Sequence, residues 1–174
     1  MFRTLPRHEE DGLGLPYPVV LIDGAEEEID ERTGERVGIF VPGMESLVAA
    51  IAVARALHPL QLHGSEVRFI RRVIGMPAKE FAEALGMDPA TLSRWENGRQ
   101  TVGEWADKEV RMAAVILLAD RVPGLGIDRK EVVGLRVVPR TEDDWPTIEM
   151  RRVHRGDAGG SERADCWDAL RLAA

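Results

Sequence analysis

The sequence predicts an α+β protein in which an all-α domain of four to five helices lies between a small N-terminal strand–helix module and a C-terminal β-hairpin. Three observations lead to this prediction. Helical periodicity is concentrated in the middle of the 174 residues, β-rich runs lie on both sides of it, and glycine or proline turns separate the segments. This length is enough for one full core or for two small domains.

The sequence of the N-terminal part predicts a loose arm followed by short strands. Residues 1–16 are polar, with two glycines and two prolines, and we expect them to form a flexible arm. β-Rich runs follow at Tyr17–Ile22 and Val37–Val41, with the turn signal Asp23-Gly24 and the acidic stretch Glu26–Arg36 between them. We therefore expect two or three short antiparallel strands.

A helix with one apolar face is predicted at Met44–Leu57. Apolar residues recur at positions 44, 47, 48, 51, 54 and 57, which is a helical spacing, and His58-Pro59 ends the pattern. The favoured interpretation of this face is core packing against the sheet or the next domain, and a dimer seam is the alternative. With the strands, this helix would complete a small module over residues 17–60.

Three short helices separated by tight turns are predicted in the middle of the chain. The first two are Glu66–Ile74 and Ala78–Leu85, and a glycine follows each of them. The third begins at Pro89, because proline is favoured at the first helical position. Ser65 and Asp88 are the expected N-caps of the first and third helices.

A fourth helix is predicted to begin at Val102 or Glu104 and to end at Ala119. It would pack on the other three and complete a domain over residues 61–122. Its expected inward-facing residues are Trp105, Val110, Ala113, Ala114, Leu117 and Leu118.

The rest of the chain is predicted to contain strands and a tail. Glu131–Val138 and Thr147–Val153 are expected to pair as a hairpin within residues 123–153. Residues 154–174 are expected to be a linker and tail, with a short helix at Ala164–Leu172.

The net charge of −7 is unevenly distributed along the chain. Residues 1–62 carry a net charge of −6, residues 63–121 a net charge of 0, and residues 122–174 a net charge of −1. An acidic total does not suggest binding to nucleic acid through bulk charge. Any such contact must therefore rest on local basic groups in the central segment.

The sequence has no pattern of a disulfide-bonded, metal-binding or membrane-spanning protein. Cys166 is its one cysteine, and the four histidines lie far apart without ligand spacing. It has no apolar stretch long enough to span a bilayer and no apolar signal core. Its acidic runs and glycine pairs lack the spacing of catalytic or phosphate-binding sites. We predict a cytoplasmic protein with no cofactor and no enzymatic activity.

The exposed side of the third helix has the composition needed to read a DNA duplex. Leu92 and Trp95 mark its buried side. Arg94 is the strongest candidate for base readout, because a guanidinium can donate two hydrogen bonds to guanine. The other predicted base-reading residues are Pro89, Ala90 and Ser93.

Basic and polar residues around this helix could hold the DNA backbone through amide, hydroxyl and guanidinium donors. The predicted backbone contacts are Arg68, Arg72, Lys79, Thr91, Asn97 and Arg99. A solvated surface charge is the alternative for each basic residue. Phosphates would repel Glu96, which is expected to bond within the domain instead.

The segment Gly75–Gly86, GMPAKEFAEALG, followed by Thr91–Gly98, TLSRWENG, resembles the XRE (lambda-repressor-like) helix-turn-helix family. The resemblance covers about residues 63–120 and implies sequence-specific DNA binding. The family usually has a glutamine at the start of the second helix, where it bonds a phosphate. This chain has Ala78 at that position, and the neighbouring Lys79 could compensate only in charge.

A narrower resemblance is to antitoxins of the MqsA (YgiT) type, and it is carried by Leu62–Arg71, LHGSEVRFIR, and by Ser93–Glu96. Those proteins place a small N-terminal module before such a domain and bind operator DNA as dimers. Their module usually holds zinc through paired cysteines, which this chain lacks. The resemblance implies an autoregulating homodimer that binds double-stranded operator DNA and a cognate toxin protein.

Two hypotheses follow from these observations. The first is a dimeric repressor with half-sites spaced by about one helical turn. The second is an antitoxin of a type II toxin–antitoxin pair, whose acidic N-terminal part would neutralise a basic, RNA-cleaving toxin. The two can hold together. A stand-alone regulator that responds to a ligand or a protein partner, without a toxin, is the remaining alternative.

Overall fold

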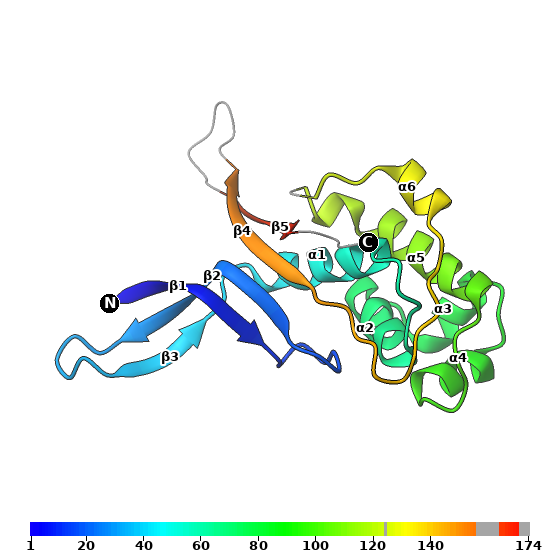
Figure 1. Cartoon of the computed structure of the whole chain (residues 1–174), viewed down its shortest axis with the longest axis horizontal. Helices are drawn as coiled ribbons and strands as arrows, with labels where there is room; N and C mark the ends of the chain where they lie inside the picture. The colour runs from blue at the N-terminus through cyan, green and yellow to red at the C-terminus, as the bar shows by residue number, and fades with distance from the viewer. Residues whose placement is uncertain (124, 156–163, 171–174) are drawn as a thin grey trace.

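The computed structural model describes residues 1–123, 125–155 and 164–170. Its strands and helices, in chain order, are β1 (Phe2–Glu10), β2 (Val19–Ile29), β3 (Arg36–Phe40), α1 (Met44–Leu57), α2 (Gly64–Ile74), α3 (Ala78–Ala84), α4 (Pro89–Glu96), α5 (Glu104–Leu118), the 3-10 helix η1 (Ala119–Arg121), α6 (Arg129–Gly134), β4 (Glu149–Arg155) and β5 (Ala164–Leu170). The strands gather at one end and most helices at the other, with α1 between them (Figure 1). The predicted α+β class is confirmed.

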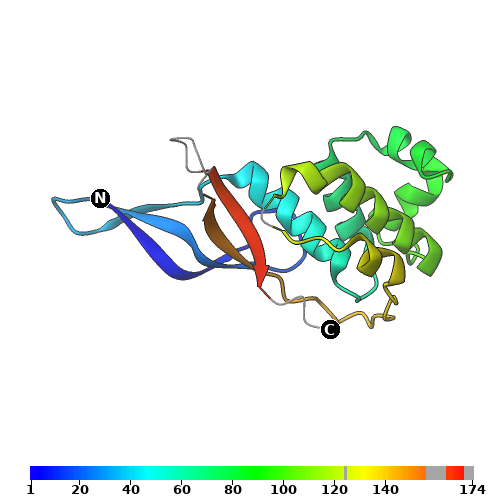
Figure 2. The ribbon, with the colours of Figure 1, turned by 90° about the horizontal axis from the view of Figure 1, so that it is seen from above.

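The described strands form one sheet in which β2 occupies the centre. β1 runs antiparallel along one side of β2. On the other side, the first half of β2 pairs in parallel with β4, and its second half pairs antiparallel with β3. β5 completes the sheet as the antiparallel neighbour of β4, beside α1 (Figure 2). Strands from the N-terminal and C-terminal parts of the chain therefore share one sheet.

β2 continues through the predicted turn at Asp23-Gly24. Asp23 has a φ of 50°, and the register between β1 and β2 shifts at Pro6, so these residues form a bulge. A Cβ on Gly24 would lie 2.6 Å from the ring of Trp167 in β5. The turn prediction was wrong. Gly24 is needed because Trp167 packs closely against it, and the positive φ of Asp23 belongs to a β-bulge within a continuous strand.

The flexible arm expected over residues 1–16 is also corrected. β1 pairs with β2 over most of its length, and the Arg3 guanidinium pairs with the Glu27 carboxylate of the neighbouring strand. Most side chains of β1 are exposed. Polar side chains are usual on an edge strand, so composition alone did not distinguish this strand from a loop.

The strand expected at Glu131–Val138 is replaced by α6 and an extended segment. The Asp128 carboxylate caps α6 by accepting the backbone N–H of Lys130 at 2.8 Å. This cap outweighs the β-branched residues that suggested a strand. Val138 keeps a single parallel bridge to Leu60, so one part of the expected extended structure is present.

The C-terminal hairpin is present, but its strands are β4 and β5. Their register runs from Glu149 opposite Leu170 to Arg155 opposite Ala164. The helix expected at Ala164–Leu172 was wrong, because periodicity in so short a segment does not separate a helix from a strand. The expected linker falls mostly on residues 156–163, which lie outside the described residues.

α1 is the centre of the hydrophobic core. Nine of its 14 residues are buried, and five of those nine are alanines, whose small side chains allow close packing on several sides. Leu47 and Ile51 are fully buried and belong to the same core cluster as the apolar residues of α2, α4 and α5. The interpretation of the apolar face of this helix as core packing is confirmed.

A buried ion pair joins α1 to α2 and is the centre of a wider network. The Arg55 guanidinium of α1 donates to both carboxylate oxygens of Glu66 in α2, with 2.9 Å between Nη2 and Oε2, and neither side chain is exposed. The Tyr17 hydroxyl donates to Glu66 Oε1 at 2.7 Å, and the backbone N–H of His63 donates to Oε2 at 2.7 Å. Arg140 Nη1 lies 3.5 Å from Oε2, as an ion contact without a hydrogen bond. One carboxylate thus ties distant segments together.

A second buried pair lies beside the first. Arg111 and Asp107 form an ion pair within α5, and both side chains are buried. Arg111 also donates to four backbone carbonyl oxygens in the last turn of α1 and just after it, including Ala56 O at 2.9 Å and Leu60 O at 2.7 Å. Such carbonyls lack donors within the helix. The Arg111 guanidinium therefore attaches α5 to the C-terminus of α1.

The network also shifts the pKa values of the titratable side chains within and beside it. Burial alone raises the pKa of the Glu66 carboxyl, but the Arg55 guanidinium and the hydrogen bonds outweigh it, so the pKa lies below its ordinary value. Burial and the Glu66 charge raise the pKa of Tyr17, whose hydroxyl stays protonated and donates. Burial, together with Arg55 and Arg111, lowers the pKa of His58 to about 4.

We expect Glu66→Gln to lower the free energy of unfolding by about 3–5 kcal/mol, because it leaves the Arg55 guanidinium buried without a counter-charge. Urea unfolding followed by circular dichroism at neutral pH measures this loss. Glu104→Gln removes the exposed pair with Lys108 and is the control, with an expected loss of less than about 1 kcal/mol. Equal losses in the two variants would contradict the importance given to Glu66.

We expect the free energy of unfolding to fall as the pH decreases from about 6.5 to about 4. The unfolded chain protonates His58 near pH 6.5, whereas the folded chain keeps it neutral and uses its Nδ1 to accept the Leu60 N–H at 3.2 Å. His58→Asn keeps an acceptor but does not titrate, so its unfolding midpoint in urea should vary less over this range. Identical pH profiles for both proteins would contradict this assignment.

Candidate nucleic-acid interface

Helices α3 and α4 form the two arms of a helix-turn-helix. α3 ends at Ala84, and Gly86 turns the chain with a φ of 65°. The Asp88 carboxylate then accepts the backbone N–H of Ala90 at 3.2 Å and caps α4, with Pro89 at its start as predicted. The turn thus brings α4 onto the surface formed by α2 and α3.

The inner side of α4 is held by the core. Leu92 and Trp95 are buried, as predicted, and they belong to one cluster with Phe81 of α3. The start of α2 approaches α4 closely, since a Cβ on Gly64 would lie 1.7 Å from the Trp95 carbonyl oxygen. Only glycine allows this backbone contact, which fixes the C-terminal end of α4 against α2.

The N-cap of α2 differs from the prediction. Ser65 was expected to cap this helix, but His63 does so, because its Nδ1 accepts the Ser65 N–H at 3.2 Å. The Glu66 carboxylate accepts the His63 N–H in return and closes a capping box. The buried carboxylate of Glu66 therefore also positions the start of the helix that supports α4.

An ion-pair cluster fixes the end of α4. Arg71 of α2 donates from Nε and Nη2 to the two carboxylate oxygens of Glu96, at 2.7 and 3.0 Å. Arg68 donates to the Glu96 carbonyl oxygen and to Asn97 Oδ1, the latter at 3.1 Å. The expectation that Glu96 bonds within the domain is confirmed. Bidentate arginine–carboxylate pairs have a defined geometry, so α4 is rigidly attached to α2.

The predicted base-reading residues share the outer side of α4. Pro89, Ala90, Ser93 and Arg94 are all exposed. The Arg94 guanidinium is held in place from two sides, because Nη2 donates to Thr91 Oγ1 at 2.7 Å and Nε donates to Gln100 Oε1 at 3.0 Å. A guanidinium has five N–H donors, so three remain for a base or a phosphate.

Some of the residues predicted to contact the DNA backbone are hydrogen-bonded within the protein, and others have side chains without a strong partner. Arg68 and Asn97 hold each other, and Asn97 Nδ2 also donates to the Ser93 carbonyl oxygen at 2.8 Å. The side chains of Arg72 and Arg99 are exposed and have no hydrogen bond or ion pair to other described residues. Lys79 is exposed at the start of α3, with Nζ 3.9 Å from Glu83. The available cations therefore come from three places in the chain: α2, the start of α3 and the loop after α4.

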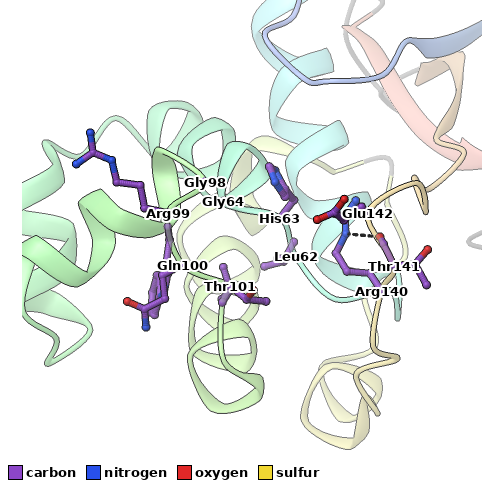
Figure 3. Close-up of a pocket in the computed structure, with 12 residues that line it drawn as sticks. Leu62, His63, Gly64, Gly98, Arg99, Gln100, Thr101, Arg140, Thr141 and Glu142 are labelled. Carbon is purple, nitrogen blue, oxygen red and sulfur yellow. Dashed lines mark hydrogen bonds between the residues drawn. The ribbon is translucent and has the colours of Figure 1, made fainter.

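A cavity of about 410 Å³ opens between the α4–α5 loop and the segment around Arg140. Gln100 and Thr101 line one side, and His63, Arg140 and Glu142 line the other (Figure 3). The lining mixes both signs of charge. Arg99 is at the rim, and its side chain reaches away from the residues of the opposite wall (Figure 3).

Sequence reasoning missed Gln100 and Arg140. Gln100 could have been found, because the Asn97-Gly98 turn folds the chain back and brings the loop after α4 within reach of Arg94. Arg140 has no comparable local signal. Its guanidinium stacks on Trp145, 4.2 Å from the ring centroid, and reaches a carboxylate 74 positions earlier in the sequence.

Two other kinds of site are absent from the described residues. No group of three or more histidine, cysteine, aspartate or glutamate side chains in the described part of the chain is arranged to hold a metal ion. Every helix within the described ranges is too short or too polar to cross a membrane. The outer side of α4 and the cations around it remain the principal candidate site.

Comparison with known proteins agrees with this geometry. A helix-turn-helix family model matches residues 68–103, from α2 to the loop before α5. The chain is also similar to a "Putative HTH-type transcriptional regulatory protein" of Sulfurisphaera tokodaii, with 26% identity over 125 residues. That match covers 69% of this chain and 42% of the relative, so the chain spans less than half the length of the relative. No solved structure matches significantly. Residues 68–103 are therefore similar to a helix-turn-helix in sequence, and the arrangement of α3 and α4 agrees with that similarity.

Proposed function

We propose that the protein is a sequence-specific repressor that binds operator DNA as a homodimer and reads bases with the outer side of α4. The observation that carries this proposal is the oriented Arg94 guanidinium, which is exposed and has three unused donors. Pro89, Ala90 and Ser93 lie on the same side and are small enough to let α4 approach base edges in the major groove.

The contacts to the DNA backbone come from the cations that have no other strong partner. Arg72, Lys79 and Arg99 are the best candidates, because each is exposed beside the helix-turn-helix. Arg68, Thr91 and Asn97 are already hydrogen-bonded within the protein, so their first role is to orient α4 and Arg94. With so few phosphate contacts, sequence readout must supply a large part of the affinity.

An exposed apolar stripe on α5 supports the homodimer. Trp105 and Leu117 were expected to face inward, but their exposed fractions are 69% and 51%. Trp105, Met112 and Ile116 recur at seven and four residues, so they share one side of the helix. A two-fold axis through this stripe would let two copies of α4 address half-sites about one helical turn apart.

The antitoxin role is the second candidate function. The part of the sheet formed by β1, β2 and β3 projects away from the helices (Figure 1). It combines the exposed aromatic residues Phe2 and Phe40 with two acidic residues on the same side of the strands. Glu28 is exposed, whereas Glu26 is partly buried and accepts Arg152 Nη1 at 2.7 Å. An acidic surface with apolar anchors suits a basic protein partner such as an RNA-cleaving toxin.

We expect the full-length protein to bind its own promoter more tightly than a scrambled duplex, and Arg94→Ala to weaken promoter binding by about tenfold to a hundredfold. Fluorescence anisotropy at two salt concentrations measures both. Arg36→Ala, which removes one exposed charge from β3, is the matched control and should bind like the wild type. Equal, steeply salt-dependent binding to both duplexes would indicate phosphate attraction alone and would contradict base readout.

For the antitoxin role, we expect the protein to co-purify with the product of the neighbouring reading frame, and Phe40→Glu to abolish this co-purification. Introducing a charge at an apolar anchor adds a desolvation cost at the interface. Promoter binding by Phe40→Glu should be unchanged, because β3 lies far from α4 (Figure 1). Co-purification that survives Phe40→Glu would rule out this surface as the toxin-binding site.

A further inference from the structure

We infer that Gln100 is a positioning residue for DNA reading. From the loop between α4 and α5, its amide oxygen holds the Arg94 guanidinium in the orientation that meets a base. The inference rests on the proposed function, in which Arg94 reads a base. It adds a residue outside the recognition helix to the determinants of sequence preference.

Two acceptors from different parts of the chain hold one guanidinium. Arg94 Nη2 donates to Thr91 Oγ1 at 2.7 Å, one turn earlier in α4. Arg94 Nε donates to Gln100 Oε1 at 3.0 Å, beyond the end of the helix. These bonds use one donor on each of the two nitrogens. Both donors of Nη1 and the second donor of Nη2 remain, and two adjacent donors of this kind match the O6 and N7 acceptors of guanine.

The loop that carries Gln100 is itself fixed at both ends. At its start, Gly98 has a φ of 68°, and the N–H groups of Gly98 and Arg99 donate to the carbonyl oxygens of Trp95 and Arg94 at 2.9 and 2.8 Å. This is a Schellman closure of α4. At the other end, Val102 is buried, and its carbonyl oxygen accepts Gln61 Nε2 at 2.7 Å. Gln100 therefore starts from a defined backbone position.

The chemistry of the glutamine suits this role. A neutral amide oxygen can accept the Arg94 N–H without cancelling the positive charge that attracts DNA. A carboxylate at this position would hold the guanidinium more strongly, but it would also repel phosphates. Ordering a long side chain before binding lowers the entropic cost of the complex. Gln100 thus supports both the affinity and the base preference of Arg94.

The test uses the full-length protein and a duplex selected by the wild type from a pool of random sequences. Gln100→Met has a similar length but no acceptor, and we expect it to weaken binding to the selected duplex by about threefold to tenfold. Its preference at the base pair read by Arg94 should fall in parallel. In an Arg94→Ala background, Gln100→Met should change binding by less than about twofold, because its effect acts through Arg94.

Gln100→Glu retains the acceptor, so it should keep the base preference while lowering affinity for all duplexes alike. A loss caused by Gln100→Met that persists in full in the Arg94→Ala background would mean that Gln100 contacts DNA itself, and would overturn the inference. Wild-type binding by Gln100→Met would overturn it as well. Failure of the proposed function can be distinguished from failure of this inference, because the wild type would then select no sequence from the pool.

Discussion

The Glu66 carboxylate is the constraint on which the arrangement of the molecule depends. It is fully buried and receives donors from α1, from Tyr17 in the segment before β2 and from the start of its own helix. Arg140 adds a charge contact from the C-terminal part of the chain. A buried charge destabilises the fold unless these partners are all present. The sheet, the central helix and the helix-turn-helix are thereby held in one relative arrangement.

The same carboxylate begins a series of contacts that ends at the candidate DNA-reading surface. Glu66 closes the capping box that starts α2, and Arg71 at the other end of α2 fixes Glu96 in α4. The helix-turn-helix therefore does not rely on its short helices alone, which are marginal in isolation. The side chains on the outer side of α4 do not pack in the core, and surface hydrogen bonds hold Arg94.

Local signals predicted helices α1 to α5 and the inner side of α4, because apolar spacing, proline and glycine act within a few residues. The buried positions of Leu92 and Trp95 followed from spacing, and the internal role of Glu96 followed from its charge. Long-range pairing was not predictable in this way. The parallel pairing of β2 with β4 and the partners of Glu66 join residues that are far apart in the sequence, and neither leaves a local pattern.

If α4 is the element that meets DNA, hydrogen–deuterium exchange of the full-length protein should reveal it when spectra with and without a selected duplex are compared. We expect slower exchange in α4, in the turn before it and in the loop that carries Gln100, with unchanged exchange in β1, β2 and β3. Slower exchange confined to the sheet, with α4 unaffected, would contradict this role of α4.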